Sequence, residues 1–225
     1  MRSRQFKSNR NKNKGFTLIE LAIVLVIIGI IIGAILKGQE LINNTKSKRL
    51  QSDLKGLESL LWTYYDRKGR WPGDCDIDGY IEYSPNNASS ATDSLSSTTD
   101  PVAESCGAAT PVENQNTSFA DLRSSKVATF STPNATLARN VLNSAFYVGQ
   151  ADDTANSGEK VNVIVAYEVP AWMAKMLDVS LDGIENGTEG RVRRWDSAVV
   201  GTSWPTDANS DTLVSVSYMF DRVLP

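Results

Sequence analysis

One long apolar segment near the N-terminus constrains this chain more than any other feature of its sequence. Residues 16–36 read FTLIELAIVLVIIGIIIGAIL, and only Thr17, Glu20, Gly29 and Gly33 interrupt the apolar run. As a helix, these 21 residues would measure about 31 Å, which matches the roughly 30 Å of a bilayer's hydrocarbon core. No later stretch of the sequence is comparable. The sequence therefore predicts one membrane-spanning helix, over residues 16–36.

The charge of the chain differs sharply before and after the start of this segment. Residues 1–15 carry six basic residues and no acidic one. The whole chain has 23 basic and 26 acidic residues and a net charge of −3, so residues 16–225 hold 17 basic and 26 acidic residues, a net charge of −9. Positive charge next to a span stays in the cytoplasm. We therefore expect a single-pass protein with a cytoplasmic N-terminus and an outward-facing remainder.

The composition excludes most familiar catalytic sites. The chain has no histidine and only two cysteines, which rules out a Ser-His-Asp triad, a Cys-His dyad, an imidazole metal ligand and a four-thiolate zinc site. Apolar residues make up 41% of the chain, enough for a folded core. A membrane-anchored hydrolase using paired carboxylates is the remaining enzymatic alternative, and no catalytic spacing supports it. We predict a protein that is not an enzyme.

Glu20 is the one charged residue inside the apolar run. A carboxylate at that depth costs roughly 2.5–3.5 kcal/mol on insertion scales and usually marks a function. A partner cation would relieve this cost. Cleavage between Gly15 and Phe16 would create an α-amino group four residues from Glu20, and the amine of one subunit could then pair with Glu20 of a neighbour.

The segment Lys14-Gly15-Phe16-Thr17-Leu18-Ile19-Glu20 resembles the type III signal sequence of type IV pilins and type II secretion pseudopilins. The shared features are a basic leader, Gly before Phe, Glu four residues later and then an apolar run, and the resemblance is strong over residues 10–66. It implies that a prepilin peptidase removes residues 1–15 by cutting after Gly15 and methylates the new terminal Phe16. It also implies that the subunits bundle their N-terminal helices into a filament, with Glu20 paired to a neighbour's terminal amine.

The resemblance implies a structural subunit of a type IV pilus-like filament. Its partners would be other copies of the chain, the prepilin peptidase and the pilus or type II secretion assembly platform. It would lie in the bacterial inner membrane with its head in the periplasm, and later in a periplasmic or cell-surface filament. The alternatives are a type II secretion pseudopilin and a minor pilin acting as adhesin or DNA-uptake receptor. Major type IVa pilins usually have a proline near the position of Lys37, which this chain lacks.

A net charge of −9 after the leader argues against a broad nucleic-acid-binding surface. A local basic cluster of Arg191, Arg193 and Arg194 remains. We therefore expect no general nucleic-acid binding.

Beyond the span, residues 37–68 are predicted to continue the helix in amphipathic form. Apolar residues recur there at spacings of three and four, typical of one helix face: Leu50, Leu54, Leu57, Leu61 and Tyr64. Gly69 and Pro72 are helix-stop signals. This half of the helix is expected to pack on a globular head.

The rest of the chain divides into a loop region and a head. Residues 69–118 form the loop region, in which 84–118 are rich in Ser, Thr, Asn, Ala and Pro, and residues 119–225 form the head. In the head the patterns predict strands over residues 161–169 and 213–220, a less regular strand over 191–200, and short helices over 138–147 and 170–177. The predicted fold class is α+β, with a long N-terminal helix packed on a small antiparallel sheet.

Cys75 and Cys106 are the only cysteines, and both lie on the predicted outer side of the membrane. In an oxidising periplasm the expected state is a disulfide. The bond would close a loop of about 30 residues and stabilise the fold by roughly 3–4 kcal/mol. The alternative is a pair of free thiols.

The segment Asp74-Cys75-Asp76-Ile77-Asp78-Gly79 resembles the first half of a calcium-binding loop. Three alternating carboxylates can converge on one hard cation, but the twelfth position is Pro85 and not Glu, and Glu82 falls at the ninth. Calcium bound by Asp74, Asp76 and Asp78 is the one cofactor that the sequence suggests. The alternative is a plain acidic turn in which Asp side chains cap backbone amides. A second acidic cluster, Asp178, Asp182 and Glu185, has no diagnostic spacing.

Overall fold

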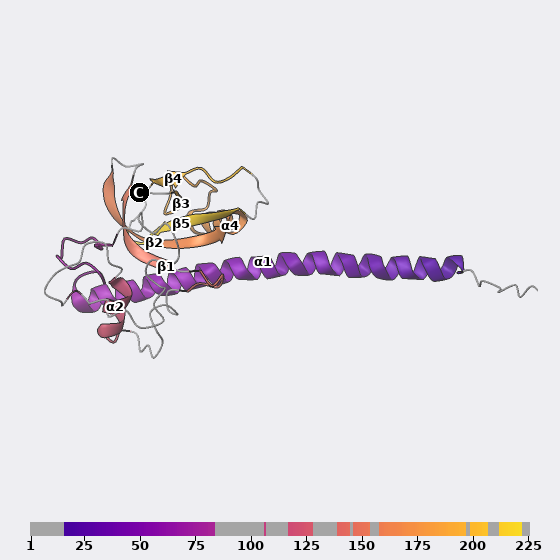
Figure 1. The fold of residues 1–225 in the computed structure, drawn as a ribbon, viewed down its shortest axis with the longest axis horizontal. Helices are drawn as coiled ribbons and strands as arrows, with labels where there is room; N and C mark the ends of the chain where they lie inside the picture. Colours follow the sequence, from indigo (N-terminus) through magenta and orange to yellow (C-terminus); the bar gives the residue numbers. More distant parts are fainter. Residues whose placement is uncertain are drawn as a thin grey trace, which may run out of the picture. The chain divides into compact units, whose positions relative to one another are not determined.

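One long helix and one antiparallel sheet of five strands make up most of the described structure (Figure 1). The structure is a computed structural model, and it describes residues 16–83, 106, 117–127, 139–144, 146–153, 158–196, 199–206 and 212–221. The helix and sheet confirm the predicted α+β class. The chain divides into two compact units, residues 1–43 and residues 44–225.

Helix α1 (Leu18–Lys68) runs through both units without a break. Its long apolar start and its later three-and-four spacing both favour an α-helix, and no proline interrupts it. The helix ends where the sequence predicts, because Gly69 adopts the left-handed φ of +72° and its N–H donates to the carbonyl of Tyr65 at 2.7 Å. A glycine has no Cβ to oppose this conformation.

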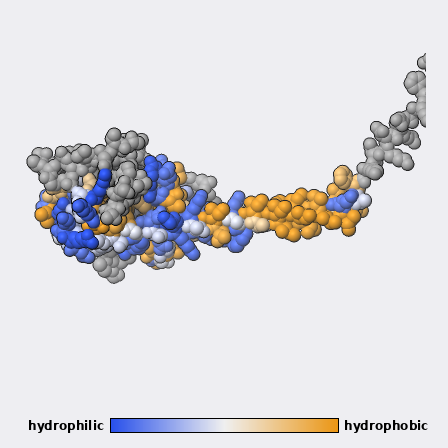
Figure 2. All heavy atoms as spheres, turned by 90° about the horizontal axis from the view of Figure 1, so that it is seen from below, coloured by the Kyte–Doolittle hydropathy of each residue, from blue (hydrophilic) through white to orange (hydrophobic). Residues whose placement is uncertain are grey.

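In the first unit, no side chain of α1 from Leu18 to Asn43 is buried. The unit contains a segment with a mean hydropathy of 3.1 over an 18-residue window, and among the described residues α1 is the one helix long and apolar enough to cross a membrane. Figure 2 shows this part of α1 as an apolar surface over most of its visible length.

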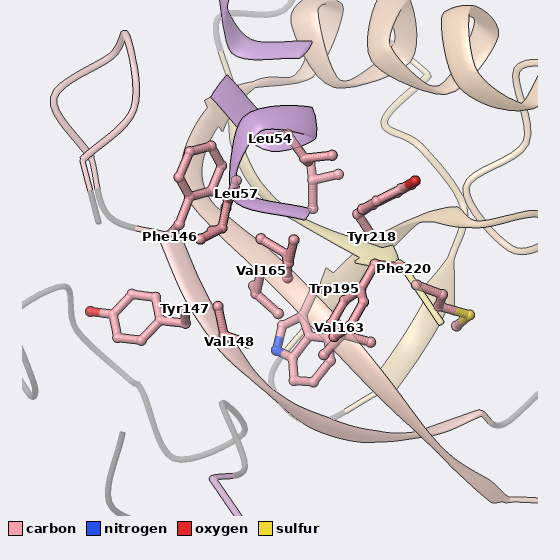
Figure 3. Packing of buried hydrophobic residues seen from close by; sticks show 14 of the residues in the cluster. Leu54, Leu57, Phe146, Tyr147, Val148, Val163, Val165, Trp195, Tyr218 and Phe220 are labelled. Carbon is pink, nitrogen blue, oxygen red and sulfur yellow. The ribbon is translucent and has the colours of Figure 1, made fainter. Parts of the chain in front are cut away.

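In the second unit, the predicted apolar stripe of α1 packs into the core. Its members are all buried: Leu50, Leu54, Leu57, Leu61 and Tyr64. Figure 3 shows Leu54 and Leu57 beside Phe146 and Val165 of the sheet. Fully burying one such side chain stabilises the fold by roughly 1.5–3 kcal/mol. Burial of one stripe therefore ties the second half of α1 to the sheet.

The sheet has the strand order β1-β2-β5-β3-β4, and every neighbouring pair is antiparallel. The strands are β1 (Phe146–Asp153), β2 (Glu159–Pro170), β3 (Val192–Asp196), β4 (Val199–Thr202) and β5 (Leu213–Met219). The residues of β2 from Val161 to Ala166 are buried without a gap. Because successive side chains point to opposite faces, both faces of the sheet are covered there.

The predicted strands over 161–169 and 213–220 are confirmed as β2 and β5. The segment 191–200 forms two strands instead of one, because β3 and β4 pair antiparallel with each other. Strand β2 also has an irregularity between Ala166 and Val169, where Glu168 adopts a left-handed φ of +55°.

The predicted helix over residues 138–147 is wrong. Residues 139–144 form a turn, in which the Asn140 side-chain oxygen accepts from the Leu142 N–H at 2.9 Å and Asn143 has a φ of +63°. Asn and Ser side chains that bond nearby backbone groups compete with a helix. Phe146 and Tyr147 then begin β1, which sequence patterns did not predict.

Two further helices complete the described part of the head. The predicted helix over 170–177 is confirmed as α4 (Ala171–Asp182), with Pro170 just before it and Gly183 ending it at a φ of +81°. Helix α2 (Ser118–Ser124) was not predicted. It carries the buried Asp121.

Candidate processing and assembly site

The start of α1 holds the residues that the signal motif singles out. Phe16 is 84% exposed, and Gly15 lies outside the described residues. Thr17 stands just before the first helical residue, and its carbonyl accepts the Leu21 N–H at 3.3 Å. Thr17 is therefore the N-cap of α1.

Thr17 and Glu20 form a reciprocal capping box. The Glu20 N–H donates to the Thr17 hydroxyl oxygen at 3.3 Å, and the Thr17 N–H donates to Glu20 Oε2 at 2.8 Å. The Thr17 hydroxyl also donates to the same Oε2 at 2.8 Å. This pairing satisfies backbone donors that a helix start leaves open. The T-x-x-E pattern of Thr17 and Glu20 is the sequence signal of this box, and it overlaps the signal motif.

The capping box has a chemical consequence for the carboxylate. Both hydrogen bonds to the carboxylate go to Oε2, which leaves Glu20 Oε1 without a partner among the described residues. The Thr17 N–H belongs to the Phe16–Thr17 peptide bond, so a cut between Gly15 and Phe16 would keep it. The carboxylate would then be held in place while Oε1 stays open to an external donor.

Gly29 and Gly33 add a feature for helix packing in the same segment. A Cβ added at either position would meet no described atom of this chain within 4 Å. Small residues spaced by four let membrane helices approach closely. The open space is therefore available to another helix.

The acidic turn after Pro72 gathers its carboxylates on backbone amides. Asp74 is buried, and its two oxygens accept from the Ile77 N–H at 2.8 Å and the Gly79 N–H at 3.2 Å. Asp76 accepts from the Asp78 N–H at 3.1 Å. Burial raises the pKa of Asp74. These bonds are those of a capped turn.

The same turn brings its acids close enough to consider a metal. One ligand atom from each of Asp74, Asp76 and Asp78 lies within 4.8 Å of the others, the only such group among the described residues. Burial, followed by the nearby Asp76 carboxylate, raises the pKa of Glu82. Oxygen ligands of this type suit calcium. Calcium binding at this turn stays a prediction.

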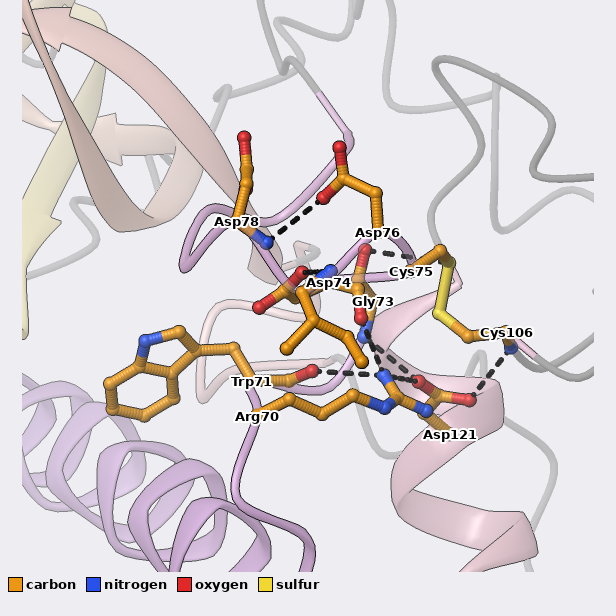
Figure 4. Close-up of a disulfide and its surroundings, with 10 residues drawn as sticks. Arg70, Trp71, Gly73, Asp74, Cys75, Asp76, Asp78, Cys106 and Asp121 are labelled. Atoms are coloured by element: carbon orange, nitrogen blue, oxygen red, sulfur yellow. Dashed lines mark hydrogen bonds and ion pairs between the residues drawn. A yellow bond between two sulfur atoms is a disulfide. The ribbon is translucent and has the colours of Figure 1, made fainter.

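The structure joins Cys75 to Cys106 by a disulfide, with 4.9 Å between their Cα atoms. Figure 4 shows the bond beside the acidic turn and the carboxylate of Asp121. Asp121 is buried, and its oxygens accept from Arg70, the Gly73 N–H and the Cys106 N–H. No sequence pattern pointed to Asp121, because its donors come from distant parts of the chain.

The second acidic cluster does not converge on one point. Asp178 accepts from the Asn186 N–H at 2.8 Å and the Trp204 indole N–H at 2.7 Å, whereas Asp182 accepts from the Arg191 N–H at 2.8 Å. Glu185 pairs with Lys175 at 3.0 Å. These acids organise the connection from α4 to β3.

Most of the five tryptophans belong to the core. Trp71, Trp195 and Trp204 are buried, whereas Trp62 is 40% exposed. Trp62 packs edge-on against Trp71, with ring centroids 4.8 Å apart.

The comparisons with known proteins agree with the geometry at the start of α1. Residues 10–36 match the family model described as the prokaryotic N-terminal methylation motif. Neither curated proteins nor solved structures give a match. The matched segment ends within α1, ahead of the antiparallel sheet. The matched motif supports the resemblance to prepilins of the type IV pilin and pseudopilin class, and it covers residues 10–36 of the chain.

Proposed function

We propose that this chain is a structural subunit of a type IV pilus-like filament. It is made in the inner membrane with its N-terminus in the cytoplasm, cut after Gly15 by a prepilin peptidase and methylated on Phe16. The matched motif over residues 10–36 supports this proposal most directly. Its work is assembly, and its partners are other copies of itself and the assembly platform of a pilus or secretion system.

The geometry of Glu20 supports the assembly step. The capping box holds the carboxylate at the first turn of α1 and leaves Oε1 open. A terminal amine of a neighbouring subunit would bring a positive charge to this oxygen. Such a pair would offset the cost of a carboxylate in an apolar setting. Methylation of the amine would keep its charge.

Mass spectrometry of the N-terminal peptide tests the processing step. We expect the full chain, made together with a prepilin peptidase, to begin at a methylated Phe16, and a Gly15→Val variant to keep residues 1–15. Gly38→Ala is the matched control, because a Cβ at Gly38 meets nothing within 4 Å. A wild-type chain that keeps its leader beside an active peptidase would contradict the proposal.

The assembly step is tested separately with Glu20→Ala. This variant should be cut normally yet fail to enter filaments. Glu40→Ala is the control, since Glu40 is an exposed acid on the same helix that pairs with Lys37 at 2.7 Å. Normal filaments from Glu20→Ala would remove the proposed role of Glu20.

Electron microscopy separates the alternatives within this class. Filaments outside the cell would identify a pilus subunit, whereas loss of protein secretion without surface filaments would identify a type II secretion pseudopilin. A minor pilin that acts as adhesin or DNA-uptake receptor would bind its ligand and would be needed only in small amounts in the filament.

A further inference from the structure

Asp121 stands between the two segments that the disulfide joins. Its Oδ2 accepts the Gly73 N–H at 2.9 Å, two residues before Cys75. Its Oδ1 accepts the Cys106 N–H at 3.1 Å. One buried carboxylate therefore holds a backbone amide on each side of the bond, as Figure 4 shows.

The contacts come from widely separated parts of the chain. Asp121 lies 48 residues from Gly73 and 15 residues from Cys106. Cys75 and Cys106 are themselves 31 residues apart. Bringing the ends of such a loop together costs conformational entropy, whichever interaction closes it. A carboxylate that binds both ends lowers the cost of the later covalent step.

The carboxylate is also fixed in its own position. Arg70 Nη1 donates to Asp121 Oδ2 at 3.0 Å and to the Asp74 carbonyl at 2.8 Å. Arg70 thereby connects Asp121 to the residue just before Cys75. Hydrogen bonds to an ionised group are stronger than neutral ones, and these donors supply the partners that a buried charge requires. Burial and the Asp121 carboxylate beside it raise the pKa of Tyr64 to about 12.

We propose that Asp121 is a positioning residue for formation of the Cys75–Cys106 disulfide. Its carboxylate binds the Gly73 and Cys106 amides in the reduced chain and so brings the two thiols within reach of each other. Oxidation then proceeds by exchange with an external disulfide. The two cysteine thiols lose two protons and two electrons as the S–S bond forms, and the external disulfide leaves as two thiols.

The test measures the thiol–disulfide equilibrium of the full chain in detergent micelles, in buffers of reduced and oxidised glutathione. This equilibrium gives the effective concentration of one cysteine thiol relative to the other. Asp121→Asn keeps the shape of the side chain and one acceptor oxygen, but it removes the charge and the second acceptor. We expect the effective concentration to fall by about 10- to 100-fold.

Asp153→Asn is the matched control. Asp153 is equally buried and, like Asp121, accepts from an arginine, Arg193, away from the disulfide. A purely structural effect of losing a buried, arginine-paired carboxylate would appear in both variants. The proposal expects Asp153→Asn to leave the effective concentration within about 3-fold of the wild type.

Equal effective concentrations in Asp121→Asn and wild type would overturn the proposal, and so would equal losses in both variants. If Asp121→Asn does not fold, Asp121→Glu keeps the charge on a longer arm. A fall smaller than that expected for Asn would then support the proposal, and an unchanged value would overturn it. This outcome is independent of whether the chain is processed or assembles.

Discussion

At the scale of single residues, the head is organised by buried carboxylates that bind backbone amides. Asp121 holds the disulfide region, Asp74 holds the acidic turn, and Asp178 holds the loop after α4. Each gathers donors that are separated along the chain or within a turn. Where the donors suffice, the buried charge is tolerated. Asp178 is the exception, because its Oδ1 is buried and has no hydrogen-bond partner among the described residues.

Asp178 predicts a pH dependence of stability. Burial raises its pKa to about 6, from an ordinary value of 3.8. Between these values the folded state binds more protons than the unfolded state, so the contribution of Asp178 to stability falls as the pH rises through this window. Asp178→Asn removes this dependence. Relative to wild type, the variant should gain at most about 3 kcal/mol of unfolding free energy between pH 4 and pH 7.

Urea unfolding followed by tryptophan fluorescence measures this difference at each pH. Asp152→Asn serves as the control, because it replaces an exposed carboxylate on β1. A difference between Asp178→Asn and wild type that stays constant from pH 4 to pH 7 would show that Asp178 has no raised pKa in the folded chain.

At the scale of elements, one face of each amphipathic helix carries the packing. In α4, Met173, Ala174 and Leu177 are buried, whereas Met176 is 39% exposed. Helix α4 lies in contact with β2, β3 and β5. Met173 and Met176 are therefore the same residue type on the same helix, but they differ in burial.

This pair predicts a contrast in stability. Met173→Ala should lower the free energy of unfolding by about 2–5 kcal/mol, because it leaves a cavity in the core. Met176→Ala should change it by less than about 1 kcal/mol, since it removes a partly exposed side chain. Chemical denaturation of the two variants in the same buffer measures both values. Similar losses would mean that α4 packs through a different face.

At the scale of the whole molecule, the two units depend on different surroundings. No side chain from Leu18 to Asn43 is buried, and this segment is strongly apolar. The core of the second unit includes the α1 stripe that begins at Leu50. The first unit needs an apolar environment from outside the chain, whereas the second contains its own core.

A truncated chain tests this division. Residues 44–225 should remain in solution without detergent and unfold cooperatively, because they keep the entire core. Residues 58–225 should fail to fold, since they lack the buried Leu50, Leu54 and Leu57. Gel filtration and near-ultraviolet circular dichroism distinguish these results. Aggregation of residues 44–225 would show that the first unit is needed for the fold of the head.

The sequence by itself was enough to predict features that depend on residues close together in the chain. The apolar run, the KGFTLIE signal, the stripe from Leu50 to Tyr64 and the stop at Gly69 are each set by neighbours within a few turns. The disulfide was also within reach, because the chain has only two cysteines. Periodicity and short motifs report these interactions directly.

Only the tertiary structure decided the features that rest on contacts between distant segments. Strand β1 exists because Phe146 to Asp153 pair along β2, although the residues before it had suggested a helix. Asp121 became important because its donors, Gly73 and Cys106, are brought to it from 48 and 15 residues away. Local patterns cannot report such contacts, because the free energy that holds them comes from packing between segments far apart in the chain.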